Sequence, residues 1–242
     1  MKKHLLLSIV LLSILTLYLP ATAQQSVTHQ NVFDTIPFIM DHHKRRLEKF
    51  SKEPMSTGKI LFLGNSITEG GPWAELLGDP TVVNRGIGGD FSYGILNRLD
   101  EIIQRKPSKL FLLIGVNDIG NDIPDAVIAD NVRKIVTRLK AESPATEIYI
   151  QSILPVNPEY PRFPQHYDKQ YHVLMTNQLL HKVALDTKVT FVNLFPLFLD
   201  DRQRLDANLT KDGLHLNRKG YEIWVEHLRE MGYLPRAPLK ID

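Results

Sequence analysis

The stretch KILFLGNSIT, residues 59–68, predicts a buried strand that ends in a tight polar turn. Four apolar residues, 60–63, lie between Lys59 on one side and Gly64-Asn65 on the other. A continuous apolar run of this length is typical of a strand buried on both faces, as in parallel sheets. Four further apolar runs follow along the chain, at residues 82–83, 110–114, 148–153 and 189–194.

The segments between these runs carry the periodicity of amphipathic helices, at residues 95–103, 127–139, 171–185 and 221–231. Strands separated by helices imply right-handed crossovers and a parallel sheet covered on both faces. We therefore predict an α/β fold of the three-layer α/β/α (flavodoxin-like) kind, with a five-stranded parallel sheet. The ligand site of such a sheet lies beyond the carboxyl ends of its strands. Residues 155–167 contain four prolines and predict a stiff loop over this edge.

The N-terminus predicts export. Two lysines, a 15-residue apolar stretch over 5–19 and the small residues before Gln24 follow the order of a signal peptide, with cleavage near Ala23. The apolar stretch is shorter than the ~20 residues that span a bilayer. We expect a periplasmic or secreted protein with no stable membrane insertion after cleavage. The remainder divides into an N-terminal extension, 24–58, with a helical arm over 32–50, and one domain, 59–242.

Charge and composition argue against several classes of partner. The chain has 29 basic and 27 acidic side chains, and two of the basic ones lie in the predicted signal peptide, so the mature chain is formally neutral. Nucleic-acid binding proteins carry a basic excess that is missing here. The charged run at 42–46 is interpreted as a solvated helix face. There is no cysteine, and the histidines show no shared metal-ligand spacing, so we expect no metal and no cofactor.

Ser66 is the candidate nucleophile. It directly follows the first predicted strand, where a serine is equally typical of a helix N-cap when taken alone. Near the C-terminus, however, Asp212 and His215 stand three residues apart. A serine hydroxyl becomes nucleophilic when an imidazole takes its proton, and a carboxylate must orient that imidazole. The three residues thus form a candidate triad for acyl transfer.

Acyl transfer also requires donors for the oxyanion of the tetrahedral intermediate. The second apolar run is followed by Gly86-Ile87-Gly88-Gly89-Asp90, and the third by Gly115-Val116-Asn117-Asp118. We predict three donors: the backbone N–H of Ser66, the backbone N–H of Gly89 and the side-chain amide of Asn117. Glycine at 89 lets the main chain approach a substrate closely.

From Lys59 to about Leu234 the chain resembles the SGNH or GDSL hydrolases. Four blocks match in order: Gly64-Asn65-Ser66, the glycine block with Gly89, Gly115 to Asp118, and Asp212 to His215. The glycine block is similar to that of platelet-activating-factor acetylhydrolase catalytic subunits and bacterial carbohydrate acetylesterases. The resemblance implies functional roles for Ser66, Gly89, Asn117 and His215, with Asp212 as the acid. The family usually has Asp before the nucleophile, where this chain has Asn65.

These residues predict a serine esterase for short-chain, chiefly acetyl, esters, most of all O-acetyl groups on a carbohydrate. Ile67 and Leu214 neighbour the nucleophile and the base and are expected to narrow the acyl pocket. Other possible substrate-pocket residues are Trp73, Tyr160, His166 and Tyr167. Two alternatives stay open: a lysophospholipase or thioesterase for longer acyl chains, and a non-catalytic carbohydrate-binding pseudoenzyme. The sequence leaves the oligomeric state open.

Overall fold

Parallel strands organise residues 37–236, the part of the chain that the computed structural model describes. In spatial order they are β2 (Val83–Gly86), β1 (Ile60–Gly64), β3 (Lys109–Leu113), β4 (Glu147–Gln151) and β5 (Thr190–Val192). Every neighbouring pair is parallel, and Gly64 at the end of β1 lies beside Gly86 of β2 and Leu113 of β3. The predicted five-stranded α/β fold is confirmed. Because the strands are parallel, the loops that follow β1, β2 and β3 meet at one edge.

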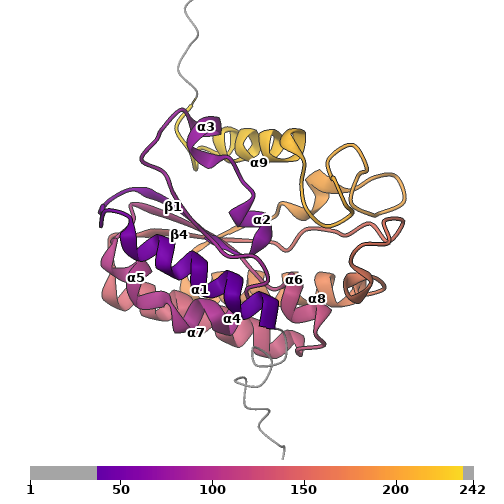
Figure 1. Ribbon diagram of the computed structural model, residues 1–242, viewed down its shortest axis with the longest axis horizontal. Helices are drawn as coiled ribbons and strands as arrows, with labels where there is room; N and C mark the ends of the chain where they lie inside the picture. The colour runs from indigo at the N-terminus through magenta and orange to yellow at the C-terminus, as the bar shows by residue number, and fades with distance from the viewer. Residues whose placement is uncertain (1–36, 237–242) are drawn as a thin grey trace, which may run out of the picture.

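Helices cover both faces of the sheet (Figure 1). One face carries α3 (Trp73–Leu77) and α9 (Arg218–Glu230). The other carries α1 (Pro37–Lys52), α4 (Ser92–Asn97), α5 (Leu99–Gln104), α7 (Asp125–Glu142) and α8 (Gln170–Thr187). Two short helices, α2 (Ser66–Glu69) and α6 (Val116–Gly120), lie at the carboxyl edge after β1 and β3. The predicted helix over 95–103 is broken at Arg98, which ends α4 and precedes α5.

An aromatic stack joins the sheet to the face that carries α9. The ring of Phe62 on β1 stacks on Trp73 with a centroid distance of 3.9 Å and on Phe111 of β3 at 4.9 Å. Trp224 of α9 meets Trp73 edge-on at 5.0 Å. These large rings are all buried, so the sheet and α9 share one apolar core, with the hydrophobic effect as the main stabilising force.

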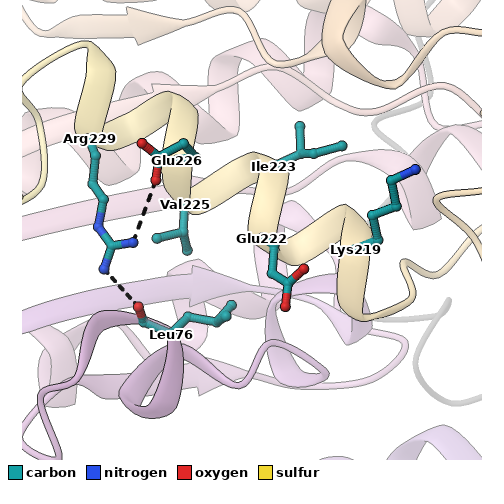
Figure 2. A pocket seen from close by; sticks show the side chains of 7 residues that line it. All are labelled: Leu76, Lys219, Glu222, Ile223, Val225, Glu226 and Arg229. Carbon is teal, nitrogen blue, oxygen red and sulfur yellow. Dashed lines mark hydrogen bonds and ion pairs between the residues drawn. The ribbon is translucent and has the colours of Figure 1, made fainter. Parts of the chain in front are cut away.

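Polar contacts fasten α9 to the nucleophile side of the domain. Figure 2 shows Arg229 on α9 reaching across to α3, where its Nη2 donates to the carbonyl oxygen of Leu76 at 2.8 Å. Its Nη1 lies 3.7 Å from a carboxylate oxygen of Glu226. On the same helix the hydroxyl of Tyr221 donates to the carbonyl oxygen of Ile67 at 2.7 Å. The C-terminal helix therefore holds the turn that contains Ser66.

The helical arm is present as α1, which begins at Pro37 and ends at Lys52. Residues 32–36 of the predicted arm, and the predicted signal peptide over 1–23, lie outside the described residues. Over residues 37–236 the structure contains no helix that is both long enough and apolar enough to cross a membrane.

The proline-rich segment over 155–167 runs as a loop with one 3-10 turn, η3 (Pro164–His166). A second 3-10 turn, η4 (Phe195–Phe198), follows β5. The segment carries a buried imidazole at His166, and η3 packs on α6. The loop therefore lies at the carboxyl edge of the sheet, as the sequence predicts.

Candidate active site

Ser66 opens α2 on the turn after β1. The cap of this short helix is its neighbour: Oδ1 of Asn65 accepts a hydrogen bond from the backbone N–H of Ile67 at 3.0 Å. Because Asn65 caps the helix, the serine hydroxyl is not needed as the cap. The alternative that Ser66 is only an N-cap therefore does not apply. Asn65 is fully buried, and its Nδ2 has no hydrogen-bond partner among the described residues.

His215 reaches the serine from the far end of the chain. Its Nε2 lies 2.9 Å from Oγ of Ser66, and its Nδ1 lies 2.9 Å from Oδ2 of Asp212. An ionised carboxylate only accepts hydrogen bonds, so Nδ1 carries the proton and Nε2 presents its lone pair to the serine hydroxyl. The structure thus brings the three predicted triad residues into one hydrogen-bonded chain.

The loop between Asp212 and His215 is built to hold this geometry. Oδ1 of Asp212 accepts from the backbone N–H of His215 at 2.7 Å and of Leu214 at 3.2 Å. Gly213 adopts a φ of 83°, a left-handed conformation that favours glycine. Burial acts to raise the pKa of Asp212, but the hydrogen bonds from the backbone and ring of His215 outweigh it and lower that pKa. Asp212 is therefore held as the carboxylate that orients the imidazole.

The predicted oxyanion donors face the same cavity as the triad. Gly89 adopts a φ of 78°, and its N–H donates to no acceptor within residues 37–236. Nδ2 of Asn117 donates one of its two hydrogens to the carbonyl oxygen of Asp90 at 2.9 Å. The other hydrogen stays available, so Gly89, Asn117 and the amide of Ser66 can serve together as donors.

Buried charged side chains brace the loops that carry these donors. The Arg98 guanidinium donates to Asp90 at 2.9 Å and to the carbonyl oxygen of Gly64 at 3.1 Å, which ties the glycine block to the end of β1. Asp118 accepts from the hydroxyl of Ser92 at 2.6 Å and from its backbone N–H at 3.1 Å. Desolvation by burial raises the pKa of Asp118 to about 6, against the effect of these hydrogen bonds.

The carbonyl oxygen of Asp90 and the ring of His166 together hold the Asn117 amide in one orientation. Because Nδ2 of Asn117 donates to Asp90, its Oδ1 faces Nε2 of His166, 3.3 Å away. Burial, and secondly the nearby His215, lower the pKa of His166 to about 4. The ring is therefore neutral near pH 7, and the contact with a carbonyl-type oxygen requires the proton on Nε2.

One cavity of about 640 Å³ contains these groups. It includes the predicted residues Ser66, Gly89, Asn117, His166, Asp212, Leu214 and His215. The remaining lining residues are His42, Glu69, Gly70, Gly88, Arg162, Phe163, Gln165 and Lys211. The apolar side chains of this lining are Phe163 and Leu214. Among the described residues, no group of three or more His, Cys, Asp or Glu side chains is placed to hold a metal ion.

Four predicted pocket residues do not line this cavity. Ile67 and Trp73 are 1% and 2% exposed and belong to the core, because the helical turn that directs Ser66 to the cavity directs Ile67 inward. Tyr160 packs on the backbone at Gly213. The hydroxyl of Tyr167 accepts a hydrogen bond from the backbone N–H of Phe163 at 3.2 Å, so this side chain stabilises its own loop.

The helical arm contributes to the site, contrary to the interpretation of its charged run as solvated. His42 on α1 lies with its Nε2 2.9 Å from Oε2 of Glu69, and Arg46, one turn on, has its Nε 3.4 Å from Oε1. The same Oε2 accepts the backbone N–H of Gly88 at 2.6 Å. Spacing at i, i+4 places His42, Arg46 and the buried Phe50 on one helix face. This spacing is the feature of the sequence that could have indicated that these three residues share a packed face of the helix.

The proline-rich loop contributes its aromatic residue Phe163 to the lining, whereas Tyr160 and Tyr167 lie outside it. The Phe163 ring meets the His215 ring at 5.1 Å with an interplanar angle of 72°. The guanidinium of Arg162 lies 5.5 Å from the centre of the Phe163 ring. This loop therefore packs against the His215 imidazole.

The fold and this constellation define a carboxylic ester hydrolase. Residues 62–223 match the model of the GDSL-like lipase/acylhydrolase family, and the chain belongs to this family. The resemblance stated from the four sequence blocks is thereby confirmed.

Relatives and solved structures agree with the family. The chain is similar to an arylesterase of Vibrio mimicus, 28% identical over 68% of this chain and 83% of the relative. It is similar to the human platelet-activating factor acetylhydrolase IB subunit alpha1, 24% identical over 74% of this chain and 76% of the relative. A structure from Streptococcus pneumonia, described in terms of platelet activating factor, has a TM-score of 0.72, with 30% identity over 84% of this chain and 96% of that one. An acetylxylan esterase from Geobacillus stearothermophilus shares the fold, with a TM-score of 0.59 and 21% identity over 75% of this chain and 98% of that chain.

Proposed function

We propose that the protein is an exported serine esterase that removes short acyl groups, chiefly acetyl, from a carbohydrate. The observation that carries the chemistry is the unbroken contact from Ser66 through His215 to Asp212, with 2.9 Å at each step. This spacing is the hydrogen-bond distance that proton transfer from a serine hydroxyl requires.

In the proposed reaction, Oγ of Ser66 attacks the ester carbonyl while Nε2 of His215 takes the hydroxyl proton. The tetrahedral intermediate expels the alcohol, which leaves with the proton that His215 returns. Water then attacks the acyl-enzyme, again with His215 as base, and the carboxylic acid is released with Ser66 restored. Asp212 stays ionised throughout and stabilises the imidazolium.

Charge on the substrate oxygen is met by donors that are already in place. The N–H groups of Ser66 and Gly89 and the free hydrogen of the Asn117 amide converge on the cavity. Preorganised donors of this kind stabilise the transition state without reorganisation during the reaction.

A short acyl group is supported by the chemistry of the cavity. Phe163 and Leu214 are its apolar side chains, and the remaining lining is polar, charged or glycine. A long acyl chain gains affinity by burying methylene groups against apolar surface, at roughly 0.8 kcal/mol each. Only two wholly apolar side chains are present for that purpose, which suits a short acyl group.

A carbohydrate as the alcohol half is supported by the hydrogen-bonding groups in this lining and by the fold shared with an acetylxylan esterase. Imidazole, guanidinium and amide groups can hydrogen-bond sugar hydroxyls, and an aromatic ring such as that of Phe163 can pack on a sugar face. The arrangement replaces the predicted contribution of Tyr160 and Tyr167, which lie outside the lining.

Export is proposed from residues 1–23, whose charged start, apolar stretch and small residues follow the order of a signal peptide. Expression of the full chain in a bacterial host, followed by mass spectrometry of the periplasmic fraction, tests it. A mature N-terminus at Gln24 is expected. A full-length chain retained in the cytoplasm contradicts export and leaves the esterase chemistry unaffected.

Two substrate comparisons test the proposed activity. The first measures release of p-nitrophenol from its acetate, octanoate and palmitate esters, and we expect the acetate to give the highest kcat/KM. The second measures acetate released from acetylated xylan, acetylated sialic acid and a short-chain phospholipid, and we expect a sugar to be preferred.

The outcomes separate the alternatives. Preference for the palmitate ester or the phospholipid identifies an acylhydrolase for longer chains or lipids. No turnover of any ester, with binding of the sugar retained, identifies a non-catalytic carbohydrate-binding protein.

A further inference from the structure

We propose that the cavity selects esters whose alcohol half carries an acidic group, a carboxylate or a phosphate, and that Arg162 and Lys211 bind this group. The proposal rests on the proposed esterase function and names the chemistry of its substrate. It follows from the balance of paired and unpaired charges around the cavity.

Both carboxylates of the lining are already engaged. Glu69 accepts hydrogen bonds from Gly88 and His42 at 2.6 and 2.9 Å, and Arg46 lies 3.4 Å away. Asp212 is bound to His215. Neither carboxylate therefore neutralises a further cation at the cavity.

The two cations are left without such partners. Within residues 37–236, neither the Arg162 guanidinium nor the Lys211 ammonium lies within 4 Å of a carboxylate oxygen, although both residues line the cavity. Both are exposed. The cavity therefore presents two positive charges that a substrate can reach from solvent.

The position of the two cations assigns them to the alcohol half of the substrate. His215 must deliver its proton to the leaving oxygen, so the alcohol departs on the side of the imidazole. Phe163 packs on that imidazole and Arg162 lies over Phe163. Lys211 directly precedes Asp212, and its backbone N–H donates to the carbonyl oxygen of His215 at 3.1 Å. Both cations thus belong to the wall that carries the base.

An oxyanion group suits this pair of cations. A guanidinium offers parallel donors that match a carboxylate or a phosphate, and an ammonium adds a point charge with rotatable donors. Opposite charges attract in water and more strongly near a protein surface, although solvent and the ordering of long side chains offset part of the gain. Two such contacts correspond to a preference on the order of tenfold, which must weaken as salt screens it.

A matched pair of esters tests the proposal. We would measure kcat/KM for 4-acetoxybenzoate and for 4-acetoxybenzamide, which differ in charge but share the acetyl group and the ring, with 4-acetoxyphenyl phosphate as the phosphate arm. For each protein we take the ratio of kcat/KM for the anionic ester to kcat/KM for the neutral ester. The wild-type ratio divided by the ratio for Arg162→Gln/Lys211→Gln gives a quotient in which the intrinsic reactivity of the two esters cancels. The control is Lys134→Gln/Arg138→Gln on α7, which removes the same charge at two residues that do not line the cavity.

We expect the quotient to be about ten at ~0.01 M salt and to approach one at ~0.5 M, with the control matching wild type. The carboxylate and phosphate arms show which acid group is preferred. A quotient near one at low salt, or a control that shifts the ratio equally, overturns the proposal. Because absence of turnover of the neutral ester by wild type would instead count against the esterase function, the two failures are distinguishable.

A binding measurement covers the case in which the double variant loses turnover. Ser66→Ala is titrated calorimetrically with 4-acetoxybenzoate and 4-acetoxybenzamide, with and without the two glutamines. Tighter binding of the anionic ester that disappears in the triple variant supports the proposal, and equal affinities contradict it.

Discussion

Nε2 of His166 lies 3.3 Å from Oδ1 of Asn117, and this contact sets the direction of an amide that faces the candidate oxyanion site. The other end of the same amide is held by the carbonyl oxygen of Asp90. A neutral imidazole on a proline-rich loop thus positions a donor on α6, a link between two segments that are distant in sequence.

This contact predicts the behaviour of two substitutions at His166. His166→Leu removes the donor to Asn117 and should lower kcat by about tenfold with little change in KM, since the amide then loses its fixed orientation. His166→Gln retains an N–H donor and should recover much of the rate. Steady-state kinetics on p-nitrophenyl acetate, with unfolding curves for both variants, checks this. Equal losses in the two variants, or an effect on KM alone, would refute the positioning role.

Asn117 itself should matter only during the reaction. Asn117→Ala should lower kcat by ~10²–10³ while KM changes little, because the oxyanion exists only along the reaction path. Asn97→Ala, an exposed amide at the end of α4, serves as the matched control and should retain activity. A change confined to KM would make Asn117 a ground-state binding residue.

Glu69 should influence the rate through the glycine block. Its carboxylate holds the N–H of Gly88, and the next amide is the proposed donor of Gly89. Glu69→Ala should reduce kcat by about tenfold, and Glu69→Gln, which keeps an acceptor, should fall between Ala and wild type. Glu75→Ala removes an exposed carboxylate on α3 and is the control. If Glu69→Ala had the same kcat as wild type, the hydrogen bond from Gly88 to Glu69 would not be needed to position the glycine block.

Asp118 should leave a signature in the pH dependence of stability. Its pKa is about 6 in the folded protein and ~3.9 in an unfolded chain, so its contribution is present below pH 4 and lost as pH rises through 6. The free energy of unfolding of wild type, minus that of Asp118→Asn, should therefore fall by ~2 kcal/mol between pH 4 and 7. Urea unfolding at several pH values measures it. A difference that is constant or rises with pH contradicts the prediction.

The sheet was predictable because its strands contain continuous apolar runs. The length of β2 was not predictable, because two of its residues are polar. The sequence predicts a strand over 82–83, whereas β2 runs Val83–Gly86. Asn84 satisfies its amide on the carbonyl oxygens of Thr68 and Glu69, and the buried Arg85 pairs with Glu101. Polar residues with tertiary partners do not register as strand in an apolar pattern. The helices α2, α3 and α6 are too short for periodicity to reveal.

The residues expected to perform the chemistry could be named from the sequence because acyl transfer demands particular groups beside particular loops. The residues that form the cavity walls could not be named in this way, because which side chains face the cavity depends on how the helices and loops pack together. Ile67 and Ser66 are neighbours, yet one enters the core and the other faces the cavity. His42 enters the site because α1 packs beside Glu69; its i, i+4 spacing with Arg46 marks a shared helix face but does not specify what that face contacts. The same holds for Phe163, which lines the cavity while Tyr167 supports the loop.

The central claim is that the Ser66 hydroxyl, activated by His215 at 2.9 Å, is the nucleophile. The most direct measurement is the rate at which purified Ser66→Ala hydrolyses p-nitrophenyl acetate, with circular dichroism to establish that it is folded. Removal of one partly exposed hydroxyl leaves the core unchanged, so the fold should persist while turnover falls by several orders of magnitude. A folded Ser66→Ala protein that turns over the ester at close to the wild-type rate would contradict the account.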